Sequence, residues 1–103
     1  MKYIITETQL DKIYFNYLDS MFKDLYTVDD RDNIIIWLNK ESWTNSQRPI
    51  FSYYVKTKEL GISAKLIMEI SSFFSLDPID STLKLTNWFE KNFELPVDEP
   101  YVM

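Results

Sequence analysis

An apolar stripe at helical spacing near the start of the chain constrains the fold more than any other feature of the sequence. Its members recur every three or four residues: Leu10, Ile13, Tyr14, Tyr17, Leu18, Met21, Phe22 and Leu25. This spacing places them on one side of an α-helix, with polar residues on the other side. We predict a long N-terminal helix from Glu7 to about Leu25. Its stripe forms one face of the core in preference to a surface for a partner helix.

The helix start is marked by local capping signals. Thr6 and Gln9 have the spacing of a capping box, in which each side chain binds the backbone N–H of the other residue. Ile5 and Leu10 flank this pair at the spacing of a hydrophobic staple. These signals concern folding and carry no chemistry.

Two β-rich runs follow. The segment IIIWLNK (34–40) and the segment IFSYYVKTK (50–58) have the composition of strands, and antiparallel pairing is the simplest connection between them. The polar segment 27–33 is predicted to be a link and the segment 41–49 a loop. Two strands alone are marginally stable, and residues 2–5 are the candidate for a third strand.

The second half of the chain is predicted to be helical. Ser63 can cap one helix, after a turn at Gly61, and Asp77 followed by Pro78 begins another. The fold class is therefore α+β: a long N-terminal helix, a small antiparallel sheet of two or three strands, and two C-terminal helices. Residues 1–95 are expected to form a single domain, and residues 96–103 an extended acidic tail.

Composition excludes several kinds of site. The chain has no Cys and no His, so disulfides, thiolate chemistry and the usual nucleophile–imidazole pairs are absent. A net charge of −5 disfavours binding to nucleic acids and to anionic membranes. No apolar run approaches the roughly 20 residues of a membrane span, and the start does not resemble a signal peptide. We expect a cytoplasmic protein, located in the host cell if it is viral, that has no enzymatic activity, cofactor or metal.

Three features could contact a partner. Trp43 lies in a polar segment where periodicity does not explain a large aromatic side chain, so it either anchors a partner or folds back over the sheet. Asp29, Asp30 and Asp32 form an acidic link that lacks the glycine of a calcium-binding EF-hand loop. Tyr101 stands in the predicted tail. We take these five residues as candidate partner contacts.

Two nucleic-acid interpretations are disfavoured. The segment KELGIS (58–63) resembles the turn of a helix-turn-helix, but the helix after it has few side chains that could address bases or phosphates. Mimicry of DNA would need a continuous acidic face, whereas lysines interrupt the acids along every predicted element.

The order of elements carries one resemblance. The start MKYIITETQLDKIYFNYLDSMFKDL, the run IIIWLN and the late segment FFSLDPIDSTLKLTNWFEKNF are similar to small uncharacterised proteins of tailed phages and environmental viral sequences. The resemblance implies a viral or mobile-element origin and no particular activity.

Together these observations predict a non-enzymatic protein-binding module, as a virus-encoded modulator of a host protein. The alternative is a small structural component of a virion or of its assembly. The protein partner is not identified by the sequence, and a homodimer is one possible state.

Overall fold

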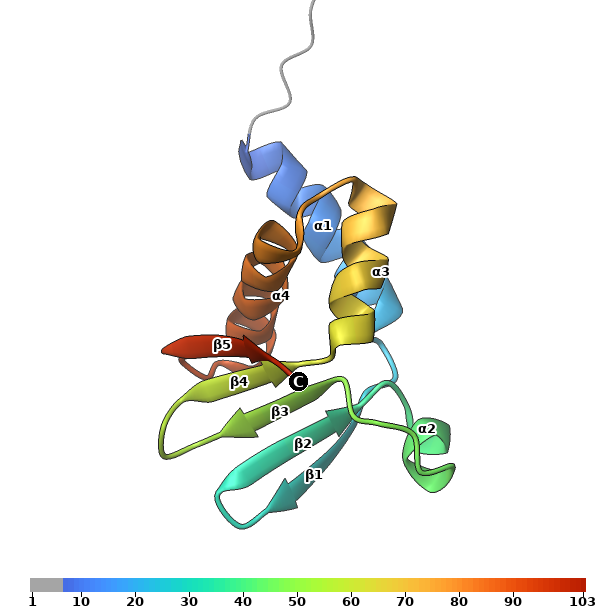
Figure 1. Ribbon diagram of the computed structural model, residues 1–103, viewed down its shortest axis with the longest axis vertical. Coiled ribbons are helices and arrows are strands. Elements are labelled where there is room, and N and C mark those ends of the chain that lie inside the picture. The colour runs from blue at the N-terminus through green and yellow to red at the C-terminus, as the bar shows by residue number, and fades with distance from the viewer. Residues whose placement is uncertain (1–6) are drawn as a thin grey trace, which may run out of the picture.

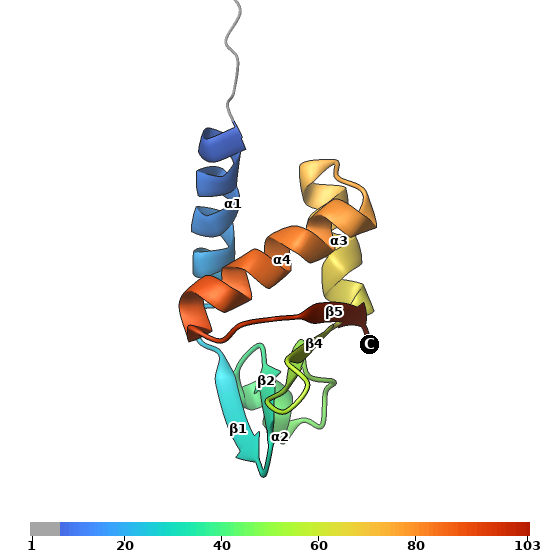
Figure 2. The ribbon, with the colours of Figure 1, turned by 90° about the vertical axis from the view of Figure 1, so that its left-hand side faces the viewer.

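The computed structural model describes residues 7–103, which form an α+β fold (Figure 1). A five-stranded sheet lies below a layer of three helices, and a short fourth helix stands beside the sheet (Figures 1 and 2). The elements are α1 (Glu7–Met21), β1 (Tyr26–Asp30), β2 (Asn33–Trp37), α2 (Lys40–Thr44), β3 (Phe51–Tyr54), β4 (Glu59–Ile62), α3 (Ala64–Phe74), α4 (Pro78–Phe93) and β5 (Glu99–Val102).

The sheet has the strand order β1-β2-β3-β4-β5. The first four strands form an antiparallel meander, while β5 runs parallel to β4. A parallel pair requires a crossover connection, and α3 and α4 supply it between β4 and β5. The last strand of the chain therefore closes one edge of the sheet.

The core lies between the sheet and the three long helices. Alternate strand residues such as Ile36, Phe51 and Leu60 are buried against side chains from the helices, including Phe22 of α1 and Phe89 of α4. Phe51 packs on Phe89 with ring centroids 5.7 Å apart. These contacts fix which face of the sheet is turned toward the helices.

Buried or half-buried polar groups link neighbouring elements. The indole N–H of Trp88 in α4 donates to the carboxylate of Asp19 in α1 at 2.8 Å. Ser71 and Ser81 join α3 to α4 through a buried hydroxyl–hydroxyl hydrogen bond of 2.7 Å. The Tyr53 hydroxyl donates to the Pro96 carbonyl at 2.6 Å, which holds the segment before β5 against the sheet. Each bond satisfies a polar group that burial would otherwise destabilise.

The predicted arrangement of elements is wrong, although the α+β class is correct. The sheet has five strands, not two or three, and the described residues contain four helices. The first helix ends at Met21, four residues earlier than predicted, because the chain leaves it to form β1. The polar segment 27–33 was expected to be a link, but most of it forms β1 and its turn into β2.

Three further predictions meet different outcomes. The strands predicted at 34–40 and 50–58 are shorter than expected, and their antiparallel pairing is confirmed. The segment predicted as a loop contains α2, whose first turn is capped by Asn39. The segment 96–103 contains β5 and so belongs to the sheet, not to a tail outside it.

The C-terminal helix starts are confirmed. The Ser63 hydroxyl accepts from the backbone N–H of Leu66 at 3.5 Å, and the Asp77 carboxylate accepts from that of Asp80 at 2.9 Å. Gly61, however, lies inside β4 and not in a turn. The Thr6 capping box and the strand predicted at residues 2–5 lie outside the described residues.

Candidate partner-binding site

The side of the sheet that faces away from the helices is the candidate site, and we call it the free face. Strand side chains alternate between the two sides of a sheet, so the residues that alternate with the buried ones along each strand point to this face. Register pairs across all five strands define two rows on it. The acidic row consists of Asp30, Asn33, Tyr54, Glu59 and Glu99. The central row consists of Val28, Ile35, Ser52, Gly61 and Tyr101.

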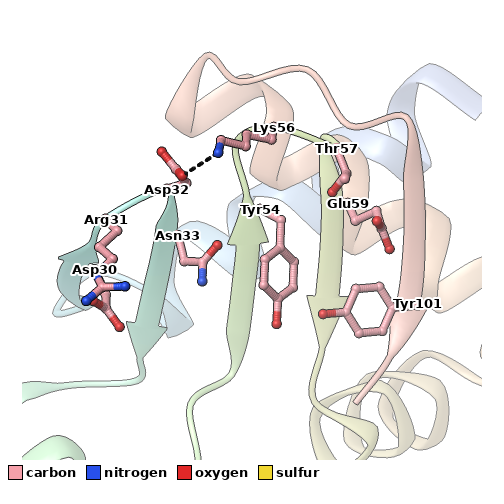
Figure 3. Close-up of a pocket in the computed structure, with 9 residues that line it drawn as sticks. All are labelled: Asp30, Arg31, Asp32, Asn33, Tyr54, Lys56, Thr57, Glu59 and Tyr101. Atoms are coloured by element: carbon pink, nitrogen blue, oxygen red, sulfur yellow. Dashed lines mark ion pairs between the residues drawn. The ribbon is translucent and has the colours of Figure 1, made fainter.

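An open groove lies at the end of the sheet where the acidic row and the two hairpin turns meet (Figure 3). It has a volume of about 820 Å³. Its lining comes from β1, β2, β3, β4 and β5 and from the two turns: Asp30, Arg31, Asp32, Asn33, Tyr54, Lys56, Thr57, Glu59 and Tyr101. The groove therefore depends on the register of the whole sheet.

Each of the two turns at this end contains one residue in a left-handed conformation. Arg31 in the β1–β2 turn has φ 56°, and Lys58 in the β3–β4 turn also has φ 56°. The backbone N–H of Val55 donates to the carbonyl of Asp32 at 2.9 Å and ties the two turns together. Lys56 and Asp32 add an exposed ion pair of 3.1 Å between them.

Two tyrosines dominate the groove floor. The rings of Tyr54 and Tyr101 have centroids 6.4 Å apart and planes 24° apart. Figure 3 shows them side by side, with their ring faces turned toward the open side of the groove. Burial, then the hydrogen bond and interaction with Tyr54, and then the charge of Glu59 raise the pKa of Tyr101 to about 12. Tyr101 is therefore a neutral phenol at physiological pH.

The groove is lined by more carboxylates than basic groups. Three carboxylates and two basic groups line it, and one basic group, Lys56, pairs with Asp32. Glu59 of β4 stands directly opposite Glu99 of β5 in the register. The parallel pairing therefore places two carboxylates on neighbouring strands at this end of the acidic row.

A second aromatic cluster lies at the other end of β1. Trp43 of α2 packs on Tyr26 with ring centroids 5.0 Å apart and stays 42% exposed. Tyr26 in turn lies near Trp37, its register partner on β2. The Trp37 indole donates to the Gln47 carbonyl at 3.0 Å, which holds the segment after α2 against the sheet. Trp43 thus folds back onto the sheet and also presents a surface to solvent.

The structure brings together three of the five predicted contact residues. Asp30, Asp32 and Tyr101 line the same groove. Asp29 is exposed, but its register partner Ile34 packs against the core, so Asp29 points toward the helix side. Trp43 lies at the far end of β1, about 13 Å along the strand from Asp30 at 3.3 Å per residue.

Sequence reasoning missed Asn33, Tyr54 and Glu59 as groove residues. No local signal marks them, because only the register of β1 to β5 places them in one row. A second hollow of about 860 Å³, between α3 and the segment 38–50, contains none of the predicted contact residues.

Within residues 7–103, no group of three or more acidic side chains is close enough to hold a metal ion. In the same part of the chain, no helix combines the length and the apolar character needed to cross a bilayer. No protein-family model, curated protein or solved structure matches this chain significantly. The similarity to small phage proteins therefore stays a prediction.

Proposed function

We propose that the chain is a non-enzymatic protein-binding module that contacts its partner through the free face of the sheet. The observation that carries this proposal is a set of partly exposed aromatic side chains on one rigid surface: Tyr26, Trp37, Trp43, Tyr54 and Tyr101. Tyrosine and tryptophan are enriched in the centres of protein interfaces, because they bury a large area at a small cost in side-chain entropy.

The arrangement of these aromatic residues supports a common surface. Tyr26, Trp37, Tyr54 and Tyr101 come from four different strands of one sheet, so their spacing is fixed by backbone hydrogen bonds. Among the described helices only the short α2 contacts this face, where Trp43 packs on Tyr26, whereas α1, α3 and α4 lie over the other face (Figure 2). A hydrogen-bonded platform places side chains more precisely than a mobile loop does.

The size of the face indicates how far the interface extends. Four strand spacings of about 4.8 Å and four residue steps of about 3.3 Å give a projected area of about 250 Å². A stable interface buries about 800 Å² of accessible surface on each partner. We therefore place the partner over the exposed side of Trp43 and α2 as well as over the sheet.

Affinity capture with paired surface variants tests this function. The sheet variant combines Tyr54→Ser with Trp43→Ser, and the control variant combines Ile79→Ser with Leu83→Ser. Ile79 and Leu83 are exposed residues of α4 in the helical layer. We expect one defined protein to be retained by the natural chain and by the control, and lost with the sheet variant. Loss with the control alone, or no specific protein at all, would overturn the proposal.

A further inference from the structure

We infer that the groove on the free face binds a basic side chain, lysine or arginine, from an extended segment of the partner protein. This inference rests on the proposed function and specifies the chemistry of the partner. The basic group would lie over Tyr54 and Tyr101 and beside the carboxylates of Glu59 and Glu99.

The acidic row supplies the charge complementarity. It carries three carboxylates and no basic residue: Asp30, Glu59 and Glu99, with Asn33 and Tyr54 between them. Neither Glu59 nor Glu99 has an ion-pair partner among the described residues. The ion pair in this part of the groove joins Lys56 to Asp32 instead. The two glutamates occupy paired register positions on parallel strands about 4.8 Å apart. A cation between them would be attracted by both carboxylates.

The location of Arg31 decides which end of the row receives the cation. Arg31 lies in the turn beside Asp30, at the end of the groove away from Tyr101 (Figure 3). Its positive charge offsets Asp30 and repels a second cation there. The site therefore lies at the Glu59 end, three strand spacings, or about 14 Å, from Asp30.

The spread of the carboxylates favours an organic cation over a metal ion. Calcium takes six to eight oxygen ligands within about 2.6 Å, which requires carboxylates that converge on one point. No such convergent group exists among the described residues. An ammonium or guanidinium group needs one or two carboxylates and tolerates an open site.

The tyrosine rings supply the second half of the recognition. A cation within about 6 Å of a ring centroid is attracted by the negative face of the ring. The centroids of Tyr54 and Tyr101 are 6.4 Å apart, so one cation above the pair can lie within that distance of both. Both ring faces point to the open side of the groove (Figure 3). The alkyl stem of lysine or arginine would lie along the same two rings.

The test uses capped five-residue peptides and NMR of the full chain. The central residue of Ser-Gly-Arg-Gly-Ser is varied to lysine, to citrulline (an uncharged isostere of arginine) and to glutamate. We expect the arginine and lysine peptides to shift the ring resonances of Tyr54 and Tyr101. We expect the citrulline peptide to bind about tenfold more weakly, because it loses the cation–π and ion-pair contributions. Equal binding of all four peptides, or no shift with the basic ones, would overturn the inference.

Variants of the chain locate the binding. Glu59→Gln should lower the affinity for the arginine peptide about threefold to tenfold. Tyr101→Leu should lower it to a similar extent. Glu69→Gln, which changes an exposed glutamate of α3, should leave it unchanged. An equal effect of Glu69→Gln would show nonspecific attraction to an acidic protein and would contradict the inference.

The two proposals can fail separately. If the peptides do not bind but the sheet variant still loses its captured protein, the basic-residue inference fails and the protein-binding function stands. If the peptides do not bind and the sheet variant still retains the captured protein, both proposals fail.

Discussion

The phenol ring of Tyr101 lies directly against Gly61 on the neighbouring strand. A Cβ built on Gly61 would stand 2.8 Å from the Cζ and Oη atoms of Tyr101, and also 2.8 Å from Cγ of Met103. Real Cβ atoms do not approach other atoms so closely, so only glycine admits the ring at this depth. The single glycine of the chain therefore shapes the floor of the groove and does not serve a turn.

Gly61→Ala should displace the Tyr101 ring and lower the free energy of unfolding by about 1 kcal/mol. This value is near the lower end of the usual cost of overpacking, because the atoms in the way belong to side chains that can move. Chemical denaturation of the variant measures this change. In a Tyr101→Ala background the same substitution should cost less, since the larger part of the clash is gone. An equal cost in both backgrounds would show that Tyr101 does not rest on Gly61.

The ionisation of Tyr101 should appear at unusually high pH. Burial and its interactions with Tyr54 and Glu59 raise the pKa to about 12, above the ordinary value of 10.0. The unfolded chain loses this proton first, so the contribution of Tyr101 to stability is complete below pH 10 and is lost as the pH rises toward 12. A phenolate absorbance titration should show a late component that Tyr101→Phe makes smaller, while burial also raises the pKa of Tyr53, whose late ionisation remains. An unchanged titration in that variant would contradict the assignment.

Phe89→Ala should lower the free energy of unfolding by about 3–5 kcal/mol, because it leaves a large cavity in the core. Phe89 is 0% exposed and contacts Phe51, Tyr53 and Phe93 through ring pairs. Leu83→Ala on the solvent side of the same helix is the matched control and should cost far less, since Leu83 is 51% exposed. A cost below about 1 kcal/mol for Phe89→Ala would contradict its place in the core.

The sequence predicted the helical half of the fold better than the sheet. Helix starts carry their own chemistry: Ser63 and Asp77 each accept the backbone hydrogen bond expected of a cap. Most of the stripe from Ile13 to Leu25 faces the core, but Ile13 itself is half exposed. The stripe could not show where α1 ends, because Leu25 keeps the helical spacing after the helix has stopped at Met21.

The strands β1 and β4 were missed for physical reasons. The β1–β2 turn is made by Arg31 and Asp32, with φ 56° at Arg31, and contains no glycine to signal a hairpin. In β1, polar residues such as Asp29 and Asp30 dominate, since this edge strand is exposed on both sides at that end. Because Gly61 weakens a strand pattern, the sequence predicts a turn where the structure has β4.

The candidate site was predictable only in part. Asp30, Asp32 and Tyr101 were chosen as charged or aromatic residues outside the predicted elements, and the structure places them in one groove. Their place in one groove comes from the register of the whole sheet, including the pairing of β5 with β4, which joins residues about 40 positions apart in sequence. Such long-range register leaves no trace in local composition.

Partner binding should depend more on aromatic contacts than on the acidic turn. Trp43→Ala should lower the affinity for the captured partner more than the double variant Asp29→Asn with Asp30→Asn does. Trp43 is 42% exposed and would be buried in the complex. Raising the salt from about 50 to 200 mM should weaken binding by less than about tenfold, far below the roughly thousandfold loss of a phosphate-like interface. Binding that survives Trp43→Ala but not the double variant would indicate mimicry of a nucleic acid.

Site-specific photocrosslinking tests the central claim most directly. A photoreactive phenylalanine analogue is placed at Tyr54 on the free face or at Leu83 on α4, and the chain is expressed in cells that supply the partner. Leu83 is 51% exposed and Tyr54 37%, so random collisions would favour the control position. The account predicts one discrete crosslinked protein from the Tyr54 position and none from the Leu83 position. A discrete product from Leu83 alone would place the partner on the helical layer and contradict the account.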